Sequence, residues 1–88
     1  METVYVIAKN VHEFNYFREQ TAVHVVYVSS IKTLIGVRSP IVLFLERARD
    51  RRDYIELSDY CTAIGAKEVS YADYTERYQQ RHHQSGAP

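Results

Sequence analysis

Glycine is scarce in this chain of 88 residues, which contains only Gly36, Gly65 and Gly86. A phosphate-binding loop needs glycine, because its missing side chain lets the backbone approach the phosphate closely. The segment that follows the first predicted strand, residues 8–13, has no glycine, and the chain has no Gly-Lys-Ser/Thr sequence. The sequence therefore excludes a P-loop and a dinucleotide-binding fingerprint.

Cysteine and long apolar runs are also scarce. The single cysteine, Cys61, excludes an intrachain disulfide, is typical of a reducing cytoplasm, and is expected to be buried on a helix face. The longest aliphatic and aromatic run has five residues, whereas a membrane-spanning helix needs roughly 20. The acidic start of the chain leads directly into a strand pattern. We therefore expect no signal peptide, no membrane partner and a cytoplasmic location.

The formal net charge is zero, but the charges are unevenly distributed along the chain. Residues 32–52 contain six basic and two acidic side chains, a local charge of +4. Residues 53–76 contain six acidic side chains and one basic one, a local charge of −5. Zero net charge argues against strong nucleic-acid binding. The uneven distribution instead predicts contact between unlike surfaces, such as head-to-tail contacts that close into a ring of identical copies.

Alternating strand and helix patterns predict a single α/β domain over residues 1–78, followed by a polar, frayed tail at 79–88. Strands are expected at residues 3–8, 22–28, 41–45 and 67–71, and helices at 11–20 and 54–64, with a short turn at 31–35 and a short C-terminal helix. Asn10 with Glu13, and Asp53 with Glu56, have the spacing of helix N-caps. Ser29-Ser30 can cap the short turn. Gly36 and Gly65 stand where the turn and the second long helix should end.

The most apolar strand, residues 41–45, has no polar interruption, which is typical of a strand buried on both faces of a parallel sheet. We expect a four-stranded, mostly parallel sheet with strand order 2-1-3-4, because this order places the two most apolar strands, the first and the third, in the middle. The order 3-2-1-4 is the alternative, and it would leave residues 41–45 at an edge.

In such sheets a ligand usually binds at the carboxyl ends of the strands, where the strand order reverses. Here that crevice is predicted to contain Lys9, Asn10, Ser29 and Glu46. Nothing in the sequence identifies a catalytic, cofactor-binding or metal-binding residue. We therefore expect no cofactor and no enzymatic activity.

Two groups of side chains are candidates for protein contacts. One is the arginine-rich connection after the central strand, and the other is a set of tyrosines on the last helix, since tyrosine is enriched at interfaces. The predicted interaction residues are Arg47, Arg49, Arg51, Arg52, Asp59, Tyr71, Tyr74 and Tyr78. The acids between the arginines make nucleic acid an unfavoured partner.

Two resemblances bear on these expectations. The stretch Leu34-x-Gly36-x-Arg38, followed by an apolar strand ending in Glu46, slightly resembles the region around the acidic strand of phage packaging-type ATPases; without a phosphate loop it implies at most a degenerate relative. Residues 4–71 resemble small α/β proteins of actinobacterial phages, of unknown function, through a Val-rich first strand, Tyr27-Val28-Ser29-Ser30, Leu34-x-Gly36-x-Arg38-x-Pro40 and Asp53-Tyr54. This second resemblance implies the source and the fold, but no activity.

The sequence thus favours a non-enzymatic, phage-type protein–protein interaction module that self-assembles, binds a host protein, or does both. The alternatives are a weak nucleic-acid-binding protein that uses the arginine-rich loop, and a degenerate nucleotide-binding fold without a P-loop.

Overall fold

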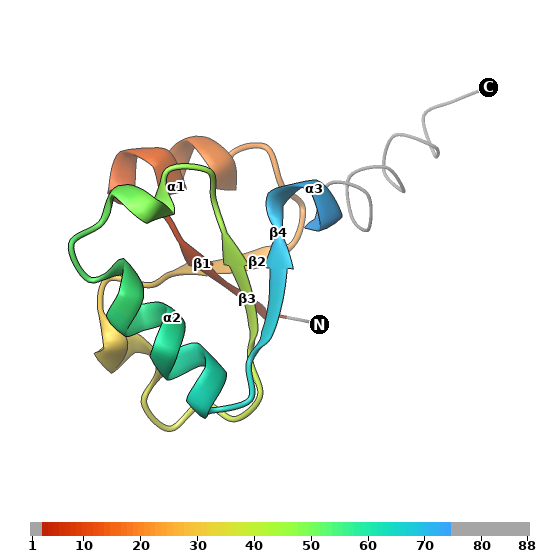
Figure 1. Ribbon diagram of the computed structural model, residues 1–88. Coiled ribbons are helices and arrows are strands. Elements are labelled where there is room, and N and C mark those ends of the chain that lie inside the picture. Colours follow the sequence, from red (N-terminus) through yellow and green to blue (C-terminus); the bar gives the residue numbers. More distant parts are fainter. Residues whose placement is uncertain (1–2, 75–88) are drawn as a thin grey trace.

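The computed structural model describes residues 3–74, which form one α/β unit (Figure 1). The elements, in chain order, are β1 (Thr3–Ile7), α1 (Val11–Arg18), β2 (His24–Tyr27), the 3-10 turn η1 (Ile31–Leu34), β3 (Ile41–Phe44), the 3-10 turn η2 (Ala48–Asp50), α2 (Tyr54–Ala63), β4 (Lys67–Ser70) and α3 (Tyr71–Tyr74). Tyr78 and the predicted tail at residues 79–88 lie outside the described residues.

The four strands form one parallel sheet with the order β2-β1-β3-β4, which confirms the predicted order 2-1-3-4. The two most apolar strands therefore lie in the middle, where both of their faces are covered. At one level of the sheet Val4 lies beside Val25 on β2 and Ile41 on β3. Leu45 is past the end of β3 but remains buried, and its N–H donates to Ile7 O at 3.0 Å.

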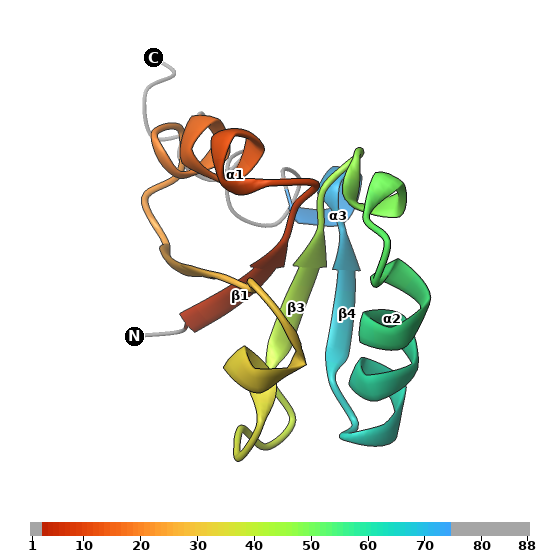
Figure 2. The same cartoon turned by 90° about the vertical axis from the view of Figure 1, so that its left-hand side faces the viewer.

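Helices cover both faces of the sheet, with α1 and α2 on opposite sides (Figure 2). One face packs against α1 and α3, and the other packs against α2 and η1. The buried residues of the first face include Val4, Val6, Leu43, Phe14, Phe17 and Tyr74, and those of the second include Ile7, Val42, Leu34, Leu57 and Cys61. Tyr16 does not belong to the buried stripe of α1 and is 71% exposed.

Most of the predicted caps are present. Asn10 accepts a hydrogen bond from the Glu13 N–H at 3.0 Å, and Ser30 begins η1 by accepting one from the Lys32 N–H at 3.2 Å. Gly36 and Gly65 have φ values of +86° and +71°, a backbone conformation that L side chains rarely adopt.

The prediction that Asp53 caps α2 is wrong, because its side chain makes no cap hydrogen bond. Both of its carboxylate oxygens instead accept hydrogen bonds from Arg51. A bidentate guanidinium–carboxylate pair is stronger than a single hydrogen bond to a backbone amide. Asp53 therefore pairs with Arg51 instead of capping the helix.

Candidate functional site

The carboxyl ends of β1, β2 and β3 lie together, and the strand order reverses between β1 and β3, as predicted. The segments that leave these ends contain the four residues of the predicted crevice: Lys9, Asn10, Ser29 and Glu46. All four are exposed. The space between the first three strand ends is nevertheless closed by side chains of the chain itself.

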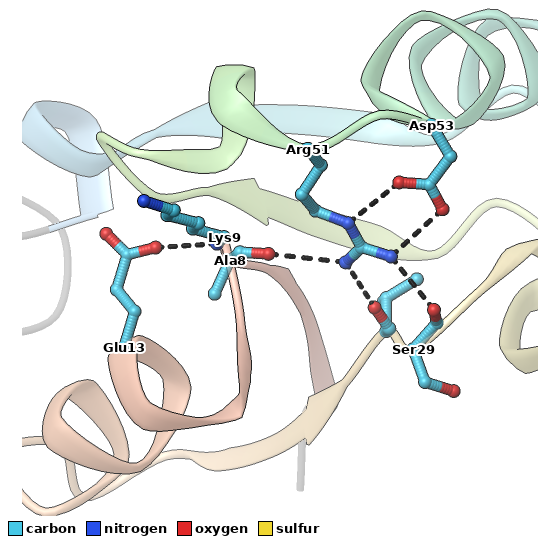
Figure 3. A network of polar contacts seen from close by, with 7 residues as sticks. Ala8, Lys9, Glu13, Ser29, Arg51 and Asp53 are labelled. Atoms are coloured by element: carbon cyan, nitrogen blue, oxygen red, sulfur yellow. Dashed lines mark hydrogen bonds and ion pairs between the residues drawn. The ribbon is translucent and has the colours of Figure 1, made fainter.

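Arg51 fills the space between the ends of β1 and β2 (Figure 3). Its Nη1 donates to Ala8 O at 3.3 Å and to Val28 O at 2.6 Å, and its Nη2 donates to Ser29 O at 2.9 Å. Asp53 neutralises the guanidinium, with an Nε–Oδ1 distance of 2.9 Å and an Nη2–Oδ2 distance of 3.0 Å. The Arg51 side chain is only 8% exposed, so its predicted role as an interaction residue is not supported: it joins two strand ends to the start of α2.

Glu13, in the first turn of α1, closes the gap between the ends of β1 and β3. Its Oε1 accepts from the Lys9 N–H at 2.7 Å, and its Oε2 accepts from the Arg47 N–H at 3.3 Å. Free backbone amides at strand ends and helix starts are the groups that bind an anion in doubly wound sheets. Here two of these amides already bind an internal carboxylate.

The remaining arginines fall into two kinds. Arg47 Nε lies 3.4 Å from Asp50 Oδ2, and the same oxygen is 4.0 Å from Lys9 Nζ. Arg49 and Arg52 are exposed, and neither forms an ion pair with another residue in the range 3–74. The predicted basic cluster is thus divided into one internal arginine, one that pairs on the surface and two that are free to meet a partner.

An open hollow of about 460 Å³ lies at the carboxyl ends of β3 and β4, and we call it the β3–β4 hollow. It is bounded by η2, α2, the edge strand β4 and α3. Its lining residues are Phe44, Leu45, Glu46, Ala48, Arg49, Tyr54, Glu68, Val69, Ser70 and Tyr71. The lining therefore combines aromatic rings with charges of both signs.

A smaller hollow of about 210 Å³ lies between α1 and α3, and we call it the α1 hollow. Its lining residues are Glu13, Tyr16, Phe17, Gln20, Leu45, Glu46 and Tyr71. Leu45, Glu46 and Tyr71 line both hollows, so the two adjoin along these three residues.

The predicted interface tyrosines have different environments. Tyr71 is 36% exposed, and its ring centroid lies 6.3 Å from that of Phe17. Tyr74 is fully buried, packs on the same Phe17 ring at 5.2 Å, and shares a hydrogen bond between its hydroxyl and that of Thr21. Tyr74 therefore belongs to the core rather than to an exposed surface, while Tyr78 lies outside the described residues.

Sequence reasoning missed most residues of these regions, among them Glu13 as a bridge between strand ends, and Tyr16, Tyr54 and Glu68 as lining of the hollows. Glu13 had a recognisable signal, the N-cap spacing, but that spacing indicates only the bond within the helix start. Asp59 is exposed on α2 and lines neither hollow.

Comparison of the chain with protein-family models, with curated protein sequences and with solved structures found no match. The resemblance to actinobacterial phage proteins therefore stays a prediction.

Across residues 3–74, no helix is long and apolar enough to cross a membrane. In the same range, no three side chains of His, Cys, Asp or Glu come together in a way that could hold a metal ion.

Proposed function

We propose that the protein is a non-enzymatic protein–protein interaction module that self-assembles through the part of its surface formed by the ends of β3 and β4. The observation that carries this proposal is the β3–β4 hollow, which lies beside an edge strand and has Tyr54 and Tyr71 in its lining. A tyrosine ring can be buried against a partner while its hydroxyl stays hydrogen-bonded, and such rings are enriched at interfaces.

The charges of the hollow support a second copy as the partner. Arg49 and Glu68 line the same hollow, are both exposed, and form no ion pair within the described residues. Two copies related by a two-fold axis can pair Arg49 of each with Glu68 of the other, because such an interface uses one surface patch twice. The alternative geometry is the head-to-tail ring, in which residues 32–52 of one copy face residues 53–76 of the next.

The two other candidate functions have less support. A nucleotide would need the strand-end crevice, where Arg51 and Glu13 already bind the carbonyls and amides. A nucleic acid would need the arginine-rich loop, where Arg51 is internal and Arg47 pairs with Asp50, which leaves few charges for phosphate contacts.

A host protein is the alternative partner for the same surface.

We also propose a cytoplasmic location. The support for it is Cys61, which is a buried free thiol of the kind common in a reducing compartment.

Light scattering coupled to size-exclusion chromatography tests the self-assembly, over a range of protein and salt concentrations. We expect the wild type to exceed the mass of a monomer at low salt and to shift toward the monomer as salt screens the charges. Tyr71→Ala should weaken the assembly. Tyr60→Ala is the matched control, because Tyr60 is a half-buried tyrosine of α2 that lines neither hollow.

A wild-type monomer under all these conditions would refute self-assembly. An oligomer that Tyr71→Ala and Tyr60→Ala affect equally would place the interface elsewhere on the molecule. The measured mass also separates a two-fold dimer from a larger ring.

A further inference from the structure

We infer that the α1 hollow binds an arginine side chain of the polypeptide partner. This inference rests on the proposed function, because it assumes that the partner is a polypeptide. The hollow has aromatic walls and a carboxylate at its border with the β3–β4 hollow, which is the combination of groups that recognises a guanidinium.

The rings of Tyr16 and Tyr71 form the aromatic walls of the hollow. Phe17, which follows Tyr16 in the sequence, also lines the hollow and contacts the Tyr71 ring. Tyr16 is 71% exposed and Tyr71 is 36% exposed, so ring surface is open to a ligand. A cation placed over an aromatic face is attracted by the negative electrostatic potential of the ring, and arginine adds stacking through its planar group.

The charge of the hollow is complementary to a cation. Glu46 is exposed and forms no ion pair within residues 3–74, and Glu13 contributes a second carboxylate to the lining. Among the described residues 3–74, no basic side chain lines the hollow. The nearest basic side chains in sequence to these carboxylates, Lys9 and Arg47, both lie close to Asp50, which offsets part of their charge.

The volume of the hollow fits one side chain better than a cofactor. It measures about 210 Å³, whereas sites for drug-sized molecules usually measure about 300–1,000 Å³. Because Leu45, Glu46 and Tyr71 also line the β3–β4 hollow, a polypeptide bound there can extend one side chain into the α1 hollow. A guanidinium can then donate in parallel to the Glu46 carboxylate while it stacks on a tyrosine.

The inference is tested with three blocked tripeptides, acetyl-Gly-X-Gly-amide, in which X is arginine, lysine or citrulline. Citrulline has nearly the shape of arginine but no charge. The readout is the change in backbone amide NMR shifts of the whole protein during titration. We expect the arginine peptide to shift signals of Tyr16, Glu46 and Tyr71, the lysine peptide to bind more weakly, and the citrulline peptide to bind least.

Glu46→Gln should lower the affinity for the arginine peptide about tenfold, because it removes the charge from a charge-assisted hydrogen bond. Glu56→Gln is the matched control, since Glu56 is an exposed acid that lines neither hollow, and it should leave the affinity unchanged. The inference is overturned if arginine and citrulline peptides bind equally, if both variants behave alike, or if the shifted signals lie outside the α1 hollow.

The two proposals fail separately. Self-assembly without arginine binding in the α1 hollow refutes only this inference. Arginine binding by a protein that stays monomeric supports the inference and refutes self-assembly, which leaves a different polypeptide as the partner.

Discussion

The carboxyl end of the sheet has two halves, one at the ends of β1 and β2 and the other at the ends of β3 and β4. Both contain arginine and acidic side chains, but these side chains differ in their contacts and exposure. At the ends of β1 and β2, all three guanidinium nitrogens of Arg51 donate to carbonyl or carboxylate oxygens, and the side chain is 8% exposed. At the ends of β3 and β4, Arg49, Glu46 and Glu68 are exposed around an open hollow. The first half is closed by the chain itself, and the second is open to a partner.

The difference shows that strand order alone does not locate a binding site. The reversal of strand order lies between β1 and β3, where doubly wound sheets usually bind a ligand. In this protein, Glu13 bridges the amides on either side of that point. The open surface is displaced by one strand, toward the edge of the sheet.

Removal of the arginine from the closed half should have the largest effect. Arg51→Met leaves the Asp53 carboxylate and three strand-end carbonyls without their donor, and breaking such a pair from one side typically costs about 3–5 kcal/mol. We expect a loss of this size in the free energy of unfolding in urea. The matched control is Arg49→Met in the open half, which should change stability by less than about 0.5 kcal/mol. Equal effects of the two substitutions would contradict the contrast between the halves.

A smaller loss is expected at the bridge between β1 and β3. Glu13→Gln keeps one acceptor oxygen but replaces the other by a donor that faces a backbone N–H, so one charge-assisted bond is lost. The expected cost in the free energy of unfolding is about 1–2 kcal/mol. Glu19→Gln, an exposed acid at the end of the same helix, should be close to neutral. If Glu13→Gln is equally neutral, then the crevice is not held closed by this carboxylate.

A third prediction takes effect only at high pH and concerns Cys61, which lies on the sheet-facing side of α2, outside both halves. Burial, with a smaller contribution from the charge of Glu68, raises the pKa of the thiol from 9.0 to about 11. Well below pH 9 the thiol is neutral in the folded and the unfolded chain. Between pH 9 and pH 11 only the unfolded chain ionises, so stability falls as the pH rises through this window.

Thermal unfolding of the wild type and of Cys61→Ala across this window measures that contribution. The difference in melting temperature between the two proteins should narrow as the pH rises from 9 to 11, because only the wild type has this titrating group. A constant difference across the window would mean that the thiol is no harder to ionise in the folded protein than in the unfolded one.

The fold could be predicted from the sequence because its signals are local and agree with one another. The uninterrupted run at residues 41–45 required a central strand, and Gly36 and Gly65 marked the turns that the structure forms with positive φ. Cys61 is buried on a helix face, as predicted, and shares that face with Leu57.

The site could be predicted only in part, because its decisive contacts join residues far apart in the sequence. Arg51 binds carbonyls that lie 43, 23 and 22 residues earlier, and no local pattern distinguishes it from the exposed Arg49 and Arg52. Asp53 illustrates the same limit: its spacing to Glu56 indicated a helix cap, but the nearby guanidinium is the stronger partner. The sequence likewise could not show that Tyr74 is buried whereas Tyr71 is exposed, because both tyrosines contact Phe17, which is far from them in the sequence.

The most direct test of the contrast between the halves is a map of backbone amide NMR shifts of the wild-type protein as its concentration is raised at low salt. This contrast predicts concentration-dependent shifts at Leu45, Glu46, Ser70 and Tyr71, around the open hollows, and unchanged signals at Ala8, Ser29 and Arg51. Shifts centred on the second group, with the first group unchanged, would contradict it.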